Sequence, residues 1–304
     1  MGYTGVSPES AWTGLAVRTT LGNPSTRPGM SLPGRVTVSA GGLPVPVDEI
    51  RVGLLTQVES PSPDARRRLL QFCSAPAAGG FAVAAGQTRA VDFALPVPWE
   101  TPVTVVDGKV PLNLRMALRT EVRVGSGLAQ GPTVPVFVHP LPAQAGVLDA
   151  LHTLAFTPRQ VGLRYGRLPW AGQLLPFHQV LGFWVAPLYT GPITELEVTF
   201  VADPEELEVV FWLDRRLALS GLTHASVSRF RVRHAGAGRQ QWPALVDGWL
   251  RRALNHHGDV AAGGPSEPIS EVMHVNRPPS EPERPGIGLE GIGGGSGEGG
   301  GGGT

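Results

Sequence analysis

The chain has 304 residues, of which 41% are hydrophobic, and its 25 basic residues balance its 25 acidic residues. This length suits about two domains, and the neutral balance predicts no steering toward nucleic acid or an anionic membrane. The single cysteine, Cys73, excludes an intramolecular disulfide. Residues 1–11 carry no signal-peptide pattern, and the most apolar window, residues 180–189, is too short to span a membrane. We therefore expect a cytoplasmic protein without stable membrane insertion and without a nucleic-acid partner.

The first half of the chain has the alternation of half-buried β-strands. Apolar residues recur at every second position in residues 112–118 and again in residues 134–138. Turn-forming pairs such as Gly41-Gly42 and Asp107-Gly108 separate runs of this kind. Short strands at such spacing are typical of an all-β sandwich. We predict a flexible N-terminus over residues 1–14 and a β-sandwich over residues 15–140.

A helical segment is expected to connect this sandwich to the rest of the chain. After the proline-rich residues 139–142, apolar side chains recur at helical spacing, and they would form one face of a short helix: Val147, Leu148, Leu151, Leu154 and Ala155. We assign residues 141–157 to this connection.

A second strand block follows and ends in another helix. Residues 194–200 alternate cleanly, and Leu207, Val209 and Phe211 continue the pattern after an Asp203-Pro204 turn. Trp242-Pro243 is a suitable helix start, and an apolar stripe follows it: Leu245, Val246, Trp249, Leu250 and Ala253. We predict a second β-sandwich with a terminal helix over residues 158–255. Residues 256–304 become rich in proline and then glycine, a composition typical of a disordered tail.

Several stretches together resemble the bacterial sporulation-control protein M family, also called stage-zero or SpoOM-like. They read, in chain order, VRTTLGNPSTRPGMSLPGRVTVSAGG at 17–42, LPVPWETPVT at 95–104, HPLPAQAGVLDALHTLAF at 139–156, LPFHQVLGFWVAP at 175–187 and ITELEVTFVADPEELEVVFWLDRR at 193–216. The resemblance extends over residues 15–254. It implies two arrestin-like β-sandwich domains in tandem and a role in regulating sporulation or development through protein contacts. It implies no catalysis.

Three arginines form the most regular charged pattern of the second half. Arg229, Arg231 and Arg233 alternate with Phe230 and Val232, which places three guanidiniums on one face of a strand. A charged strand of this kind can discourage unwanted pairing at a sheet edge. It can also bind an acidic partner segment or a lipid headgroup, and an added partner strand would repeat on the same interval. We therefore name these three arginines as the partner-binding candidates.

The acidic residues of the second block allow a different interpretation. Glu195, Glu197 and Glu208 would share the polar face of a strand pair, where clustered carboxylates can act as an acid/base pair or bind calcium. The simpler interpretation is a solvated sheet face, paired with Arg215 or Arg216. We predict no catalytic, metal-binding or cofactor-binding residues, because no nucleophile motif or closed ligand set is present.

The function predicted from the sequence is that of a non-enzymatic regulatory or adaptor protein whose partners are other proteins. A homodimer is a second kind of partner that the sequence leaves open. The alternatives are a β-sandwich that binds carbohydrate or lipid through exposed aromatic residues, and a hydrolase that uses the three glutamates. We expect Trp184 and Trp212 to lie mostly in the core, which would count against the binding alternative.

Overall fold

The computed structural model describes residues 3–6, 14–59, 67–106, 108, 114–190, 193–219, 221 and 224–273. The chain divides into two units, a compact unit Met1–His274 and a second unit Val275–Thr304. All of the structure described below belongs to the first unit. Within the described residues, no helix combines the length and the apolar character that crossing a membrane would require.

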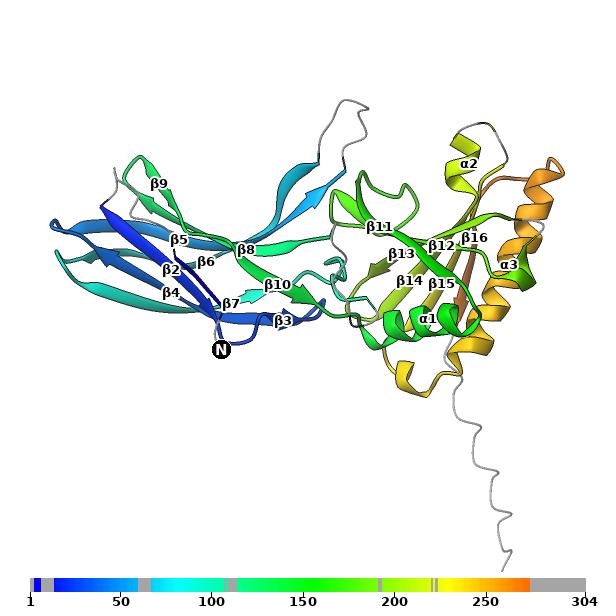
Figure 1. Ribbon diagram of the computed structural model, residues 1–304, viewed down its shortest axis with the longest axis horizontal. Coiled ribbons are helices and arrows are strands. Elements are labelled where there is room, and N and C mark those ends of the chain that lie inside the picture. The colour runs from blue at the N-terminus through cyan, green and yellow to red at the C-terminus, as the bar shows by residue number, and fades with distance from the viewer. Residues whose placement is uncertain are drawn as a thin grey trace, which may run out of the picture. The chain divides into compact units, whose positions relative to one another are not determined.

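The first half consists of two β-sheets (Figure 1). One sheet has the order β1-β2-β4-β7 and comprises β1 (Tyr3–Val6), β2 (Leu15–Leu21), β4 (Ser31–Ala40) and β7 (Thr88–Pro96). The other has the order β3-β10-β8-β5-β6 and comprises β3 (Ser25–Thr26), β10 (Val134–Val138), β8 (Met116–Val124), β5 (Val45–Val58) and β6 (Arg68–Val83), with β9 (Gly127–Gln130) beside β8.

The core of this half lies between the two sheets, as the alternation predicts. Along β2, Leu15, Val17, Thr19 and Leu21 are buried, and the intervening residues face outward. The Oγ1 atoms of Thr19 and of Thr120 on β8 are 2.7 Å apart, which joins the two sheets by a buried hydrogen bond. The predicted apolar positions Leu114, Met116 and Leu118 are buried, as are Val134, Val136 and Val138. Leu112 lies outside the described residues.

The predicted connecting helix is α1 (Pro142–Thr153). Pro142 is in its first turn, and the Gln144 side chain accepts a hydrogen bond from the Leu141 amide at 2.8 Å. Val147, Leu148 and Leu151 are buried, as their spacing predicts, and they belong to the core of the second half. The helix is therefore a structural layer of that half as well as a connection.

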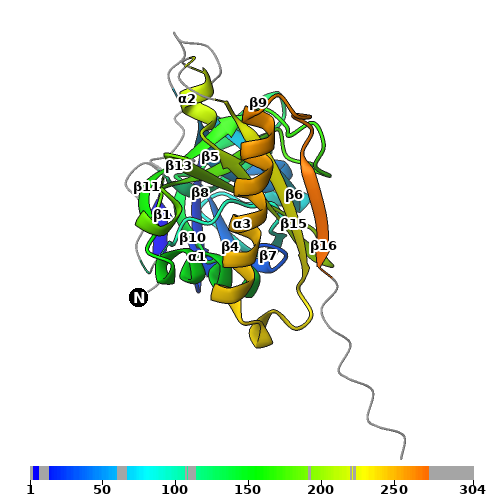
Figure 2. The same cartoon turned by 90° about the vertical axis from the view of Figure 1, so that its right-hand side faces the viewer.

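The second half has one six-stranded sheet, with strands in sequence order from β11 to β16. These are β11 (Thr157–Tyr165), β12 (Phe177–Trp184), β13 (Glu195–Ala202), β14 (Glu206–Leu213), β15 (Ser226–Arg233) and β16 (Ile269–Met273). Figure 2 is turned so that α3 (Trp242–Ala261) lies in front of this sheet. The all-β class is confirmed. The layer packed against this sheet, however, consists of α1 and α3 rather than of a second sheet among the described residues.

The terminal helix begins where the sequence predicts but extends further. Val246, Trp249, Leu250 and Ala253 are buried, and the Trp249 ring stacks on Phe230 with centroids 5.0 Å apart. The predicted boundary at residue 255 is wrong, because α3 continues to Ala261 and β16 follows it. The helical stripe continues there through two buried histidines instead of aliphatic residues. Residues 274–304 of the predicted tail lie outside the described residues.

Three shorter elements complete the second half: η1 (Pro187–Tyr189), α2 (Arg215–Leu219) and η2 (Ala237–Arg239). Main-chain hydrogen bonds also join the two halves away from the connecting helix. The Glu59 amide, just after β5, donates to the Leu163 carbonyl at 2.7 Å, and the Tyr165 amide donates to the Glu59 carbonyl at 3.1 Å. These two bonds form an isolated parallel bridge between Glu59 and Arg164.

Candidate protein-interaction surface

The acidic and basic candidates of the sequence lie on one face of the second sheet. Because strand residues alternate between faces, Glu195, Glu197 and Glu208 point away from α1 and α3. In the antiparallel register of β14 and β15, Glu208 is opposite Arg231, and Val210 is opposite Arg229. We call this surface the charged face.

Each glutamate of the charged face is paired with an arginine. Arg159 on β11 binds Glu195, and Arg229 binds Glu208. Arg164 on β11 donates two hydrogen bonds to Glu197, at 2.6 and 2.7 Å. Such bidentate pairs are the strong form of an ion pair. In the described contacts, Arg159, Arg164 and Arg229 take the place of the expected Arg215. The Arg216 side chain lies outside the described residues, so its pairing with a glutamate stays a prediction.

A glycine on β12 lies next to Glu197 in the sheet register. Gly182 is opposite Glu197 on one side and Gln160 on the other. A β-carbon at this position would approach the Gln160 side chain to 2.8 Å. The Gln160 side chain therefore occupies the space above Gly182 on the charged face.

The predicted solvated sheet face is in fact largely buried. Glu195 and Glu197 are each 1% exposed. A second apolar cluster covers part of the face, where Leu168 packs with Val201, Val210 and Val227. Within the described residues, no group of three or more histidine, cysteine, aspartate or glutamate residues could hold a metal ion. Each of these glutamates lies against a guanidinium.

Aromatic rings extend the charged face around the loop before β12. Trp170 lies 5.5 Å from Trp212 between centroids. The Arg229 guanidinium is 5.6 Å from the Trp170 ring, and that of Arg215 is 4.0 Å from the Trp212 ring. Cations over indole rings are favourable contacts. The Arg215 Nη1 atom is buried and has no hydrogen-bond partner among the described residues.

The three candidate arginines differ in exposure. Arg229 is 11% exposed at its side chain, Arg231 is 34% exposed, and Arg233 is exposed. Arg231 lies 3.5 Å from Glu206 and 3.8 Å from Glu208. The expectation of a free strand edge is wrong, because β14 and β16 occupy the two edges of β15. The role of these arginines in partner binding stays a prediction.

The two tryptophans expected in the core are only partly enclosed. Trp212 is half-buried in the Val210 cluster. The prediction for Trp184 is wrong, since it is 47% exposed at the end of β12. The Arg159 guanidinium lies 4.5 Å from its ring. The alternation of β12 does place Trp184 on the charged face, but the sequence pattern does not show how much of that face is covered.

A buried serine, histidine and aspartate meet at one end of the sheet, and the sequence did not indicate this. The Ser226 hydroxyl lies 3.0 Å from His257 Nδ1, and His257 Nε2 lies 4.0 Å from Asp214. Burial lowers the pKa of His257. Ser226 is 2% exposed, so its hydroxyl does not face solvent. Asp214 also accepts hydrogen bonds from the amides of Thr194 and Glu195, so the group fastens α3 to the starts of β13 and β15.

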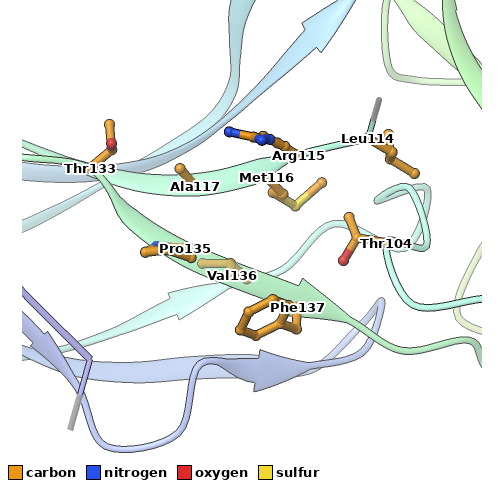
Figure 3. A pocket seen from close by; sticks show the side chains of 9 residues that line it. All are labelled: Thr104, Leu114, Arg115, Met116, Ala117, Thr133, Pro135, Val136 and Phe137. Carbon is orange, nitrogen blue, oxygen red and sulfur yellow. The ribbon is translucent and has the colours of Figure 1, made fainter. Parts of the chain in front are cut away.

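An apolar cavity lies in the first half, where β8 and β10 pair. Figure 3 shows Met116 and Val136, which are opposite each other in the register, with Leu114, Phe137, Thr104 and Arg115 around them. The cavity has a volume of about 360 Å³. Beyond this pair, β10 turns to the Thr104 segment, because the Val138 amide donates to Thr104 Oγ1 at 2.7 Å. The separation of the two strands opens the cavity.

The segment that carries Trp99 and Thr104 also contacts the second half. The Glu100 carboxylate accepts hydrogen bonds from the amides of Leu174 and Leu175, at 2.6 and 2.8 Å. The Gln179 side chain accepts from the Val103 amide at 3.0 Å and donates to the Val103 carbonyl at 2.8 Å. These contacts explain the placement of two stretches that carried the family resemblance, residues 95–104 and 175–187.

The fold defines this chain as an arrestin-like, mainly β protein. Residues 12–217, more than half of the chain, match the model of a family described as SpoOM protein. The chain therefore belongs to the SpoOM family.

Two known proteins agree with this assignment. The sporulation-control protein spo0M of Bacillus subtilis (strain 168) is 29% identical over 191 residues, which cover 62% of this chain and 71% of that protein. The crystal structure of Spo0M, sporulation control protein, from Bacillus subtilis matches with a TM-score of 0.66 at 21% identity. The structural match covers 84% of this chain and 100% of the Spo0M chain.

Proposed function

We propose that this chain is a non-enzymatic regulatory protein that controls sporulation or development as a cytoplasmic adaptor, through contacts with other proteins. The observation that carries the proposal is the family match, which runs through both halves of the chain. The Bacillus subtilis relative is named a sporulation-control protein, and this name supplies the process.

The geometry of the charged face supports an adaptor better than a hydrolase. Glu195, Glu197 and Glu208 each bind an arginine. A general acid or base must lie within hydrogen-bond reach of a substrate atom, and here guanidiniums occupy that position. The carboxylates instead link strands: Glu195 and Glu197 on β13 reach arginines of β11 across β12, and Glu208 joins β14 to β15.

The most accessible charges of the face are at its β15 end. Arg233 is exposed, and Arg231 is partly exposed beside Glu206. We propose that an acidic partner segment binds here, with Arg231 and Arg233 in contact and Arg229 holding Glu208 beneath them. Arginine suits this role because its guanidinium can bind a carboxylate through two hydrogen bonds.

Gene deletion and complementation in the source bacterium test the proposal. We expect deletion to change spore formation or development and the unmodified gene to restore it. A variant with Arg231→Ser and Arg233→Ser should fold but fail to restore, whereas Arg123→Ser, an exposed arginine on β8, should restore fully. Normal development of the deletion strain would refute the regulatory role. Full restoration by the double variant would refute this contact surface alone.

The cavity of Figure 3 favours a second candidate function, the binding of a lipid-like ligand. Its walls include Leu114, Met116 and Val136, and apolar pockets of this size hold small ligands. Titration with a fluorescent fatty acid tests this candidate, with Ala117→Trp as a variant that fills the cavity. Binding that is unchanged by Ala117→Trp, or absent in the unmodified protein, would exclude the cavity as a lipid site.

A further inference from the structure

Among the described residues, the strand β16 forms the edge of the second sheet and pairs with β15 alone. Five residue pairs make up this ladder, from Ser228 with Ile269 to Val232 with Met273. The pairing is parallel, whereas the other four strand pairs of the sheet are antiparallel. Parallel pairing is slightly less stable per residue. β16 is therefore joined to the sheet on one side, through a parallel ladder, which is less stable per residue than the antiparallel ladders of the other strands.

Side-chain packing adds little at the start of this strand. Ile269 is half-buried, and Ser270 is exposed. The main neighbour of β16 is β15. The main-chain hydrogen bonds of the ladder attach the strand to the β15 edge. Any copy of the same segment can form these bonds.

An exposed link separates β16 from the helix that precedes it. Residues 262–268 follow α3, and Gly263 has a φ of +90°, a left-handed conformation that favours glycine. Pro265, Ser266 and Glu267 are exposed, and a second proline, Pro268, directly precedes the strand. Prolines favour an extended conformation of the residue before them. Seven extended residues reach at most about 23–25 Å, so the link can carry β16 away from its own chain.

We propose that β16 is an exchangeable strand: the β15 edge that it covers is also a docking surface for the same segment, Ile269–Met273, of a second copy of this chain. The occupant follows from the structure, because ISEVM is the sequence that this edge is seen to hold, and every copy carries one. Reciprocal exchange closes a two-fold dimer, which is the commonest symmetric assembly.

Protein concentration decides between the two pairings. Within one chain, the link gives β16 a high effective concentration at its own β15 edge. Exchange replaces this ladder by an identical ladder, so the dimer gains no strand contact and loses only this intramolecular advantage. The exchanged dimer is therefore minor in dilute solution and grows as the protein is concentrated. The inference goes beyond the proposed function, since it names a partner by its sequence.

Disulfide trapping between two single-cysteine proteins tests the exchange. Both carry Cys73→Ser; one also carries Arg231→Cys and the other Val272→Cys, positions that are opposite each other in the ladder. A β16 strand on another copy's β15 holds these two thiols opposite each other, whereas random collision joins them less often. After mixing, concentration and oxidation, we expect a mixed disulfide dimer whose yield rises with protein concentration.

A matched control replaces Val272→Cys by Ser266→Cys, which lies in the exposed link outside the ladder. We expect this pair to form several-fold less mixed dimer. A double variant, Arg231→Cys with Val272→Cys in one chain, reports whether the ladder forms, because it should give an intrachain disulfide in dilute solution. Mixed dimer no greater than the control, together with that intrachain disulfide, would show that β16 stays in its own chain and would overturn the proposal.

Discussion

At the residue scale, the bidentate pair between Arg164 and Glu197 is a central contact of the charged face. Glu197 is 1% exposed, whereas the Arg164 side chain is 29% exposed. Removing one partner of a buried ion pair leaves the other charge without compensation, which is strongly destabilising. The contribution of this ion pair to the stability of the folded protein therefore depends on its burial.

We predict that Glu197→Gln lowers the free energy of unfolding by about 3 kcal/mol, at the lower end of the range for buried pairs because Arg164 is partly exposed. Urea denaturation measures this change. The matched control is Asp92→Asn, which breaks the exposed pair with Arg35 in the first half. Exposed pairs contribute little, so this variant should unfold like the unmodified protein. If both variants lose the same free energy of unfolding, burial does not determine how much an ion pair stabilises this protein.

His257 predicts a pH dependence of stability. Burial lowers its pKa below the ordinary value of 6.5, an effect that His224 and His256 reinforce and Asp214 opposes. The unfolded chain then binds more protons than the folded chain at pH values just below 6.5. The stabilising contribution is thus complete above the unfolded pKa and decreases as the pH falls. Burial also lowers the pKa of His178, which adds a dependence of the same sign.

We expect urea denaturation from about pH 8 to about pH 5 to show this loss of stability. His257→Gln should make the dependence less steep, because it removes the titrating group. The control His152→Gln changes an exposed position on α1 and should leave the slope unaltered. A slope that His257→Gln does not reduce would assign the dependence to His178 or to other groups.

At the scale of elements, α1 and α3 pack closely at a glycine. A β-carbon on Gly146 would lie 2.3 Å from the Trp242 ring, whereas one on Gly258 of α3 would meet nothing within 4 Å. Alanine is favoured over glycine inside a helix by about 1 kcal/mol. Forcing an extra group into a packed interface costs about 1–3 kcal/mol. The same substitution should therefore have opposite effects at the two positions.

We predict that Gly146→Ala destabilises the protein by about 1–2 kcal/mol and that Gly258→Ala stabilises it by up to about 1 kcal/mol. Thermal unfolding of the two variants shows directly whether each substitution raises or lowers the stability. Stabilisation by Gly146→Ala would mean that Trp242 moves aside at little cost, and that the contact between α1 and α3 is looser than described.

At the scale of the whole molecule, Gln179 joins the two halves. Its amide forms two hydrogen bonds with the main chain of Val103, and it is 6% exposed. We predict that Gln179→Leu lowers the free energy of unfolding by about 2–5 kcal/mol, because it leaves a buried N–H and a buried carbonyl without partners. The exposed Gln130→Leu should change it by less than about 0.5 kcal/mol. Calorimetry would reveal whether the halves then unfold separately.

Truncation distinguishes the predicted boundary from the observed one. Ending the chain after His274 removes only the second unit, Val275–Thr304, and should leave the melting temperature unchanged. Ending it after Asn255 also removes β16 and the buried His256 and His257, and should lower it markedly. Equal melting temperatures for the two truncations would restore the boundary predicted from the sequence.

The sequence by itself determined the elements whose patterns are local. Alternation at β8, β10 and β13 and the helical stripes of α1 and α3 depend on periods of two and 3.6 residues, which are readable without knowing any partner. The family resemblance placed these elements in order, and the family match confirms it. The same local patterns gave the positions of Arg229 and Glu197, but not their surroundings.

Only the tertiary structure decided what covers each face. Arg159 and Glu195 are 36 residues apart in the chain and meet across an intervening strand. The charged face has the polar alternation of a solvated sheet face, but its glutamates are buried and paired with arginines. The helical layer over the second sheet, the exposure of Trp184 and the parallel return of β16 beside β15 have the same origin. A period tells which side of a strand is apolar, whereas the covering element, and hence the burial of a charge, depends on chain segments too distant for the pattern to register.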